Sequence, residues 1–441
     1  MNNCSNAKRG TAGFSCLIRI GIVLAGLCLP LLQGCSDATP DTEEPVPATA
    51  DASNPDMAPV IAAVPEAVDH AGPEKVAEIT NQLALKLYQA FAQGDDNLCF
   101  SPISVATVLS MGLSGARATA ARELETVLGL EPGHTAHEGF KQLLAGIEVN
   151  NSARSRLLLA NAFMHQQGMN PIDNFLNVIG TNYGAEVFAT DFARRPGEAC
   201  EQLNSWVEHN TDGRISGFLD SNDVDANTCL ILANTLLFDG AWASPFDANR
   251  TTEAPFHRDR GGDVYVAMMY QQGRFSSYIG SDEAQIIRLP YAGDRVEMVV
   301  ILPAEGKSLR TLEDTLTTEQ LSTWIGRCGP QEVDLHLPRF KGRTKFYLND
   351  ILSSLGAPCI FDPGCADFSG ISSERFWISY VKHACYVEAD EEGTKAAAAT
   401  AMIGTRSSPQ AFRADRPFLY LIRETTNGAI LLMGRVVDPR D

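Results

Sequence analysis

The residue types that most often perform catalysis or bind metals are sparse and scattered in this sequence of 441 residues. Of its eight histidines, the two nearest in sequence are His134 and His137, in a segment flanked by glycine and proline that we interpret as a loop. The sequence contains no Gly-x-Ser-x-Gly, His-Glu-x-x-His, P-loop or Gly-x-Gly-x-x-Gly pattern. Such patterns would position a nucleophile, a zinc ion or a phosphate group. Their absence argues against an enzyme and against a metal site, so a hydrolase of unrecognised type is the weakest interpretation that we keep.

A different chemistry, the insertion of a strand into a sheet, is indicated by residues 391–404. Alternate positions form one face without any charge, and its members are Thr394, Ala396, Ala398, Thr400, Met402 and Gly404. Lys395 lies on the opposite face. A strand with this alternation can enter a sheet with its small side buried and its charge in water. In isolation the same composition also suits a linker or a surface helix, since alanine is the best helix former.

Four further segments decide between these interpretations, and they are 100–107, 234–246, 412–418 and 432–439. They read Phe-Ser-Pro-Ile-Ser-Val-Ala-Thr, Asn-Thr-Leu-Leu-Phe-Asp-Gly-Ala-Trp-Ala-Ser-Pro-Phe, Phe-Arg-Ala-Asp-Arg-Pro-Phe and Leu-Met-Gly-Arg-Val-Val-Asp-Pro. Together with 391–401, they resemble the ordered motifs of the serpins, the serine protease inhibitor family. The resemblance covers roughly residues 73–441. It implies an α+β fold with a large central β-sheet, two smaller sheets, about eight to nine helices and an exposed reactive-centre loop at about 391–411.

The resemblance assigns roles to three groups of residues. The hinge of the reactive loop would comprise Glu391, Glu392, Gly393, Thr394, Ala396, Ala398 and Thr400. Trp242 would lie at the top of the large sheet, where the loop begins to enter, although a tryptophan there is also explained by core packing. A buried polar cluster beneath the sheet would comprise Ser101, Ser104, Asn234 and His383. Its members must hydrogen-bond one another, because an unpaired buried donor costs about 1–3 kcal/mol. Such a cluster can act as a switch between a closed and an opened sheet.

The resemblance also implies a bait bond in the loop, about fourteen to fifteen residues after the hinge glycine. Counting from Gly393 gives Ser407-Ser408 as the cleaved bond. One residue earlier, Arg406-Ser407 offers a long cationic side chain. The first choice implies an elastase-like or subtilisin-like target protease, and the second implies a trypsin-like one. Both alternatives stay open on the sequence.

The elements that must position these residues follow from periodicity and turn signals. Helices are predicted at 116–128, 172–182 and 196–209, after Pro73 and Ser101-Pro102, and as two short segments within 308–327. Strands are predicted at 157–165, 229–240, 331–338, 376–389, 418–424 and 429–437, with several more in 264–302. Helices and strands do not alternate regularly, which favours α+β over a doubly wound sheet.

The N-terminal segment reads as an export signal. Lys8, Arg9 and Arg19 precede the apolar run 20–32, which is too short and too interrupted by glycine and proline for a spanning helix. The run ends in Leu-Gln-Gly-Cys, which resembles the bacterial lipobox and predicts lipidation of Cys35. Residues 1–34 would then be a lipoprotein signal peptide, 35–72 the lipidated cysteine with a flexible tether, and 73–441 the folded domain. The expected location is a bacterial cell-envelope membrane, on the periplasmic side or at the cell surface.

The seven cysteines after the tether show no Cys-x-x-Cys pair and fit no zinc site. Cys99, Cys229 and Cys385 stand in apolar runs and are predicted to be small buried side chains. Cys359 and Cys365 flank a Pro-Gly turn and could form a disulfide in an oxidising compartment.

The combined prediction is a serine protease inhibitor that acts by a suicide mechanism. The protease would form an acyl-enzyme with the cut loop, which would insert into the large sheet and trap it. The partners would be that protease and, through the lipid anchor, a membrane; the protein would be a monomer without cofactor. The net charge of −19 argues against a nucleic-acid partner. The first alternative is a non-inhibitory serpin that acts as a binding or chaperone-like protein.

Overall fold

The computed structural model describes residues 68–69, 71–149, 155–279, 282–393 and 409–440. These residues belong to one unit of the chain, Pro65–Asp441. The predicted signal peptide, Cys35, most of the predicted tether, and residues 394–408 of the predicted reactive loop lie outside the described part.

The helices of the described part of the chain agree in several places with the cap signals of the sequence. They are α1 (Pro73–Phe91), α2 (Pro102–Gly115), α3 (Ala118–Leu128), α4 (His137–Val149), α5 (Asp173–Tyr183), α6 (Pro196–Asn210), α7 (Leu309–Glu313), α8 (Thr318–Arg327) and α9 (Asn349–Ser354), with 3-10 turns at Ala248–Arg250 and Cys359–Phe361. Ser101 caps α2, because its Oγ accepts a hydrogen bond from the Ser104 amide and Pro102 occupies the first helical position. Gly129 ends α3 with a φ of 70°. His137 was predicted to lie in a loop, but it begins α4.

The strands form three sheets in the described part of the chain. They are β1 (Val68–Asp69), β2 (Leu98–Phe100), β3 (His134–Thr135), β4 (Ser155–Gln166), β5 (Glu186–Thr190), β6 (Leu230–Gly240), β7 (Thr252–His257), β8 (Asp263–Tyr278), β9 (Ala284–Pro290), β10 (Val296–Pro303), β11 (Gly329–Pro338), β12 (Phe340–Tyr347), β13 (Tyr380–Ala389), β14 (Gln410–Arg413), β15 (Phe418–Glu424) and β16 (Ile430–Val436). The central sheet has the order β12-β13-β6-β4-β5, and the pair β1-β3 stands apart.

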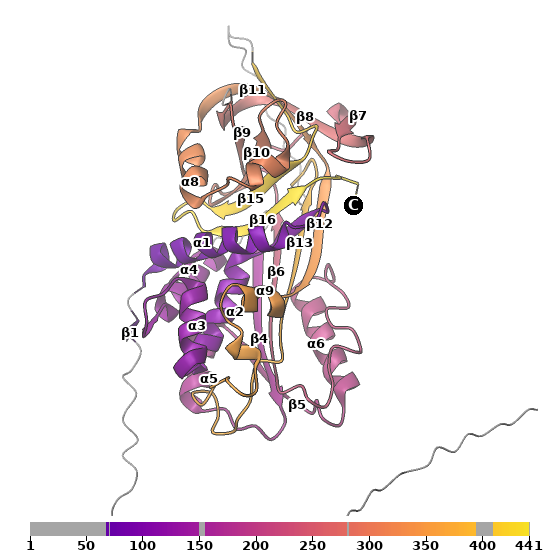
Figure 1. Ribbon diagram of the computed structural model, residues 1–441. Helices are drawn as coiled ribbons and strands as arrows, with labels where there is room; N and C mark the ends of the chain where they lie inside the picture. The colour runs from indigo at the N-terminus through magenta and orange to yellow at the C-terminus, as the bar shows by residue number, and fades with distance from the viewer. Residues whose placement is uncertain (1–67, 70, 150–154, 280–281, 394–408, 441) are drawn as a thin grey trace, which may run out of the picture. The chain divides into compact units, whose positions relative to one another are not determined.

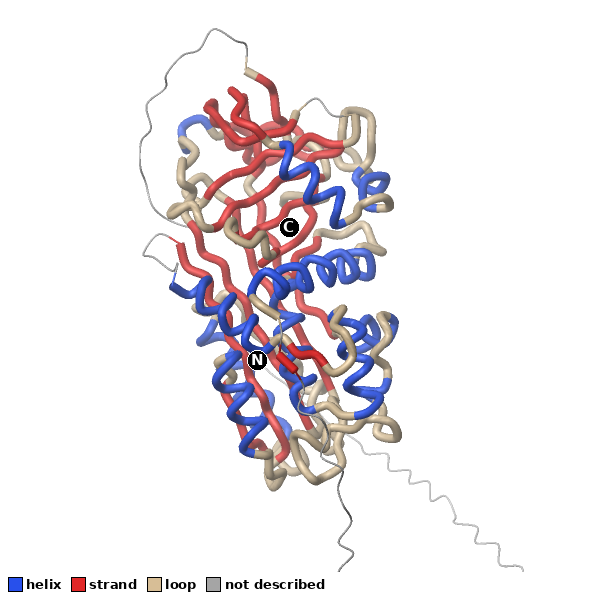
Figure 2. Tube along the Cα trace, turned by 90° about the vertical axis from the view of Figure 1, so that its left-hand side faces the viewer, coloured by secondary structure: helices blue, strands red, loops and turns tan. Residues whose placement is uncertain are grey.

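The other strands form a single nine-stranded sheet instead of two smaller ones. Its order is β14-β11-β8-β9-β10-β15-β16-β2, with β7 also paired to β8. The reason is β8, whose residues 263–268 pair with β7 and 268–277 with β11, while its last residues, 276–278, also pair with β9. These strands occupy the upper half of the molecule in Figures 1 and 2, above most of the helices.

The central sheet carries helices on both faces, and the alternation along β6 decides which side chains meet them. Ile231 and Ala233 pack with α6 in one cluster, whereas Leu232 and Leu236 belong to the larger core on the other face. That face meets α2, nearly all of whose side chains are buried (Figure 1). Asn234 is in phase with Leu232 and Leu236, so its side chain lies on the α2 face.

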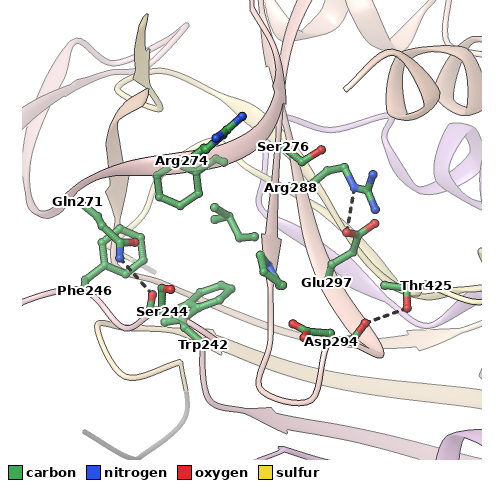
Figure 3. A pocket seen from close by; sticks show the side chains of 13 residues that line it. Trp242, Ser244, Phe246, Gln271, Arg274, Ser276, Arg288, Asp294, Glu297 and Thr425 are labelled. Carbon is green, nitrogen blue, oxygen red and sulfur yellow. Dashed lines mark hydrogen bonds and ion pairs between the residues drawn. The ribbon is translucent and has the colours of Figure 1, made fainter. Parts of the chain in front are cut away.

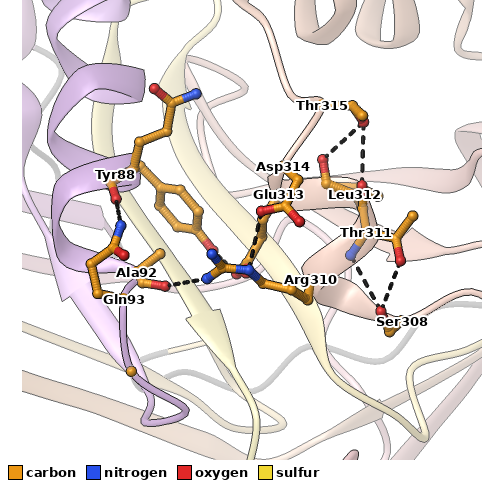
Figure 4. A network of polar contacts seen from close by, with 12 residues as sticks. Tyr88, Ala92, Gln93, Ser308, Arg310, Thr311, Leu312, Glu313, Asp314 and Thr315 are labelled. Atoms are coloured by element: carbon orange, nitrogen blue, oxygen red, sulfur yellow. Dashed lines mark hydrogen bonds and ion pairs between the residues drawn. The ribbon is translucent and has the colours of Figure 1, made fainter.

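A buried polar network holds α1 against α7 (Figure 4), and a residue of β16, Arg435, joins it. The Tyr88 hydroxyl donates to Glu313 Oε1 at 2.5 Å, and Arg435 Nη1 lies 2.9 Å from the same oxygen. The side chains of Glu313 and Arg435 are each only 5% exposed. Both charges are therefore paired in the core, and removing one partner would leave the other buried without compensation.

Candidate functional site: a sheet seam and its clasp

The candidate site lies along the seam between β6 and β13, two parallel neighbours in the middle of the central sheet. They pair from Tyr380 with Ile231 to Tyr386 with Leu237, so the sheet is closed at this position. β13 ends at Ala389, and the chain then leads through Asp390–Gly393 into the segment that the sequence predicts to insert. An incoming strand would have to separate β6 from β13.

The backbone of residues 390–393 is hydrogen-bonded to the loop that follows β6, at residues 242 and 246. We call this set of contacts, together with the side-chain contacts of Glu391, the clasp. Trp242 contributes two hydrogen bonds, from Nε1 to the Asp390 carbonyl at 2.8 Å and from its amide to the Glu392 carbonyl at 3.1 Å. The Phe246 amide donates to the Glu391 carbonyl at 2.8 Å. Trp242 is 2% exposed and stacks on Tyr291 at 4.4 Å between ring centroids. Trp242 therefore packs in the core and also contacts the segment that the sequence predicts to be the loop hinge.

Glu391 holds the clasp through its side chain. Arg339 donates from Nη2 to Oε1 at 2.6 Å and from Nε to Oε2 at 2.7 Å, and the Thr251 hydroxyl donates to Oε1 as well. The Glu391 side chain is 7% exposed, whereas that of Arg339 is 49% exposed. Burial raises the pKa of the Glu391 carboxyl, but the hydrogen bonds from Arg339 and Thr251 outweigh it, so the pKa lies below its ordinary value. The fork-to-fork geometry of this ion pair makes it stronger than a single charged contact.

Gly393 can only be a glycine in this arrangement. Its φ of 92° lies in a region that side chains other than hydrogen disfavour. A Cβ here would overlap the carbonyl oxygen of Gly240 and the amide nitrogen of Trp242. The hinge therefore passes directly against the backbone at the end of β6. Glu392, the other described hinge residue, is exposed and bonds its amide to the Asp390 carboxylate at 3.0 Å.

The predicted polar cluster beneath the seam is brought together only in part. His383 Nε2 accepts a hydrogen bond from the Ser101 amide at 2.9 Å, and Ser101 Oγ accepts from the Ser104 amide. The contacts of the two serines thus run through backbone amides, and the Ser104 hydroxyl has no partner among the described residues. His383 is fully buried, and this burial lowers the pKa of its imidazole to about 3.

Asn234 bonds to a residue that the sequence analysis did not identify. Its Nδ2 donates to Asn161 Oδ1 at 2.7 Å, and Asn161 Nδ2 donates to the Tyr183 carbonyl at 2.7 Å. Asn161 lies opposite Asn234 in the antiparallel pair of β4 and β6. The available signal was one uncharged polar residue in the middle of the apolar run 157–164. No residue of the described chain hydrogen-bonds Asn234 to His383, although the two face each other across the seam.

Comparison with known proteins decides the family. The family model described as "Serpin (serine protease inhibitor)" matches residues 78–439. The chain belongs to the serpin family.

Individual serpins are similar over nearly their whole length. Leukocyte elastase inhibitor A of Rattus norvegicus is 33% identical over 379 residues, which cover 83% of this chain and 100% of that protein. An uncharacterized serpin-like protein of Thermococcus kodakarensis is 34% identical, over 84% of this chain and 87% of that protein. Among solved structures, human thyroxine-binding globulin complexed with thyroxine has a TM-score of 0.76 at 28% identity, over 84% of this chain and 100% of that one. Uncleaved ovalbumin has a TM-score of 0.76 at 26% identity, over 82% and 100%. The predicted α+β serpin fold is confirmed.

Two of the residues that bond to Glu391 in this serpin, Arg339 and Thr251, were not identified from the sequence. Both lie more than fifty residues from Glu391 in sequence, so no local pattern connects them to it. The remaining hinge residues, 394–400, and the bonds proposed for cleavage at Arg406, Ser407 and Ser408 lie outside the described residues, as does Cys35. In the described part of the chain, no cluster of three or more histidines, cysteines or acids could hold a metal ion. That part also contains no helix that is both long and apolar enough to cross a membrane.

The cysteines of the serpin domain follow the sequence prediction with one exception. Cys359 and Cys365 form a disulfide, while Cys99 and Cys385 are free and fully buried. Cys229 was predicted to be buried, but it is only half-buried because it stands just before β6 at the surface end of the sheet.

Proposed function

We propose that this serpin inhibits a serine protease by trapping it as an acyl-enzyme while the cleaved loop inserts into the central sheet, and that it has no catalytic activity of its own. The observation that carries the proposal is the hinge at 390–393. It leaves the end of β13 directly beside the seam with β6, and it is followed by residues with an uncharged alternate face. The inhibitory relatives named as leukocyte elastase inhibitors support the same function.

The direction of the chain suits the insertion. β6 and β13 are parallel, and a loop that turns back at Gly393 would run between them antiparallel to both. It would exchange one β6–β13 ladder for two new ladders, one on each side. Each backbone hydrogen bond contributes about 0.5–1.5 kcal/mol net, so a strand of several residues yields a large gain. This gain is what would hold the protease in a distorted acyl-enzyme before water completes hydrolysis.

The class of target protease follows from which peptide bond of the loop is cleaved. Cleavage after Arg406 would suit a protease with an anionic specificity pocket of the trypsin type. Cleavage after Ser407 would suit an elastase-like or subtilisin-like pocket that accepts small side chains. Mass spectrometry of the released C-terminal peptide distinguishes the two, because the peptides differ by one serine.

The decisive experiment mixes the soluble domain, residues 73–441, with a panel of serine proteases and looks for a complex that survives denaturing electrophoresis. The expected result is one covalent complex with a trypsin-like, elastase-like or subtilisin-like enzyme. Loop-cleaved protein should also melt well above the uncleaved protein, since the inserted strand adds hydrogen bonds and buried contacts. Cleavage without a complex, combined with equal melting temperatures, would refute the inhibitory mechanism.

That negative outcome would favour the alternative, a serpin that works by binding. One solved neighbour, thyroxine-binding globulin, is named for the small molecule in its complex. A binding protein of this kind would keep its ligand affinity without consuming a protease.

We further propose that Cys35 is lipidated and that residues 36–72 tether the domain to a membrane of a bacterial envelope. A flexible chain of this length has a root-mean-square reach of roughly 30–37 Å. Replacing Cys35 by serine should release the protein from the membrane fraction. An unchanged partition between membrane and soluble fractions would refute the anchor.

A further inference from the structure

A cavity of about 450 Å³ lies beside the clasp (Figure 3). Its walls come from the loop after β6, from strands β8, β9 and β10, and from the turn after β15. Its size is in the range of small-molecule sites in proteins. None of the inhibitory chemistry described above uses it.

One wall of the cavity is apolar and aromatic. It consists of Trp242, Phe246, Phe275, Leu289 and Pro290. Phe246 meets the Trp242 ring edge-on, with 6.2 Å between centroids. A flat hydrocarbon ring is the ligand body that such a wall would accept.

Two of the four charged side chains that line the cavity, Arg288 and Glu297, pair with each other. Arg288 Nε lies 2.9 Å from Glu297 Oε2, and Arg423 Nε lies 2.9 Å from the other oxygen of the same carboxylate. Arg274, in contrast, makes no hydrogen bond or ion pair with any described residue. Its cross-strand neighbour in β11 is Glu332, which forms no ion pair with it. An exposed guanidinium at the mouth of an aromatic cavity is a ready partner for a carboxylate or sulfonate.

Asp294 restricts the ligand further. Its side chain lies at the opposite end of the cavity from Arg274 (Figure 3). A second anionic group at that end would be repelled by this carboxylate. The cavity therefore suits a single anionic group at one end and an uncharged aromatic body.

The cavity shares two residues with the clasp. Trp242 and Phe246 line it, and the same residues donate backbone or side-chain hydrogen bonds to the carbonyls of residues 390–392. A ligand packed on these rings would favour the position in which the hinge is held closed. Strand separation at the top of the seam would then be slower.

We propose that this cavity is a binding site for an amphipathic aromatic monoanion and that its occupant retards loop insertion. The second half rests on the proposed inhibitory function; the first half does not. A ligand that slows insertion lets the acyl-enzyme hydrolyse, so more inhibitor molecules are consumed for each protease molecule inactivated.

Binding is tested on the uncleaved domain by fluorescence titration with anilinonaphthalene sulfonate and with phenylnaphthylamine, its uncharged counterpart. Arg274→Gln removes the guanidinium, Arg122→Gln removes an exposed guanidinium on α3 as the matched control, and Ser276→Phe fills the cavity from β8. Arg274→Gln should raise the dissociation constant of the sulfonate about tenfold or more, and that of the uncharged dye less than twofold. Ser276→Phe should abolish the binding of both dyes. Equal sulfonate affinity in the two arginine variants, or unchanged affinity in Ser276→Phe, would overturn the site.

The coupling is tested by counting inhibitor molecules consumed per inactivated protease, with and without saturating sulfonate. The count should rise severalfold in the wild type and not in Ser276→Phe. A constant count in the presence of bound dye would overturn the coupling and leave the site intact. If no protease forms a stable complex, the inhibitory function fails, while the binding titration still decides on the site.

Discussion

Protonation of His383 is expected to destabilise the closed sheet, and the structure sets the size of the effect. The imidazole is fully buried under the seam, and its Nε2 accepts the Ser101 amide at 2.9 Å. A proton on Nε2 would break this bond and place a charge in the core. Burial accordingly lowers the pKa to about 3, against about 6.5 for an imidazole in water.

The pH dependence of the free energy of unfolding follows from the difference between the pKa of His383 in the folded protein and in the unfolded chain. The folded protein binds this proton more weakly than the unfolded chain does. The contribution of His383 to the free energy of unfolding is therefore fully present above about pH 6.5 and is lost as the pH falls toward 3. Each pH unit in that window is worth about 1.4 kcal/mol. At pH 5.0 the loss from this one group is therefore about 2 kcal/mol, a sizeable part of the ~5–15 kcal/mol that stabilises most domains.

The assay compares urea unfolding of the wild type and of His383→Gln between pH 7.5 and 5.0. Glutamine does not titrate, and its carbonyl oxygen can still accept the Ser101 amide. The stability difference between the two proteins should therefore shift by about 2 kcal/mol over this range, in favour of the variant at low pH. His209→Gln, at the exposed end of α6, is the matched control and should follow the wild type. A wild-type-to-His383→Gln difference that is independent of pH would refute the reasoning.

Three other predictions address the hinge and the disulfide. Thr394→Arg should turn the inhibitor into a substrate, because a charge on the inserting face would have to be buried. Lys395→Glu should change the number of inhibitor molecules consumed per inactivated protease far less, and equal effects of the two variants would contradict the predicted register. Gly393→Ala should lower the melting temperature by the equivalent of about 1–3 kcal/mol, since the added methyl group meets backbone atoms at a positive φ; an unchanged melting curve would contradict the hinge geometry. Replacing Cys359 and Cys365 by alanine should cost about 2 kcal/mol for so short a loop, and a reductant should destabilise the wild type but not the variant.

The parts of the fold that the sequence predicts well are those with local causes. The hydroxyl and proline at Ser101-Pro102 predict the start of α2, and Gly129 predicts the end of α3. The apolar run 229–240 predicts β6 almost to the residue. His137 was assigned to a loop because the glycines and the proline before it concealed the helix that follows. The strand β12 was missed because its exposed positions carry Lys and Arg, which do not signal a strand.

The residues of the candidate site likewise fall into those that the sequence predicts and those that only the fold reveals. The hinge at Glu391–Gly393 and the tryptophan at 242 are visible in the sequence because they belong to contiguous motifs. Arg339 and Asn161 are not, because each becomes a partner only when distant strands are placed side by side. A buried charge predicts that a partner exists, but the fold alone decides which of the chain's arginines supplies it.

The seam itself is held mainly by the backbone, and this determines how it opens. His383 and Asn234 face each other across it, yet each bonds to its own side, to the Ser101 amide and to Asn161. In the described residues, no hydrogen bond between side chains of β6 and β13 crosses the seam, so separating the two strands there breaks only ladder bonds.

The side-chain contacts that resist opening lie elsewhere, at the clasp and on the α6 face. On that face, Lys382 and Glu388 of β13 pair with Asp223 at 2.7 Å and Arg214 at 3.1 Å, in the segment that leads from α6 to β6. This segment ties β13 to the chain that continues into β6. Under the proposed mechanism, insertion from the hinge would first release Trp242 and Glu391 and only then displace the α6 connection. We expect substitutions at the clasp to change the rate at which insertion begins, and substitutions at Lys382 or Arg214 to change the rate at which it is completed.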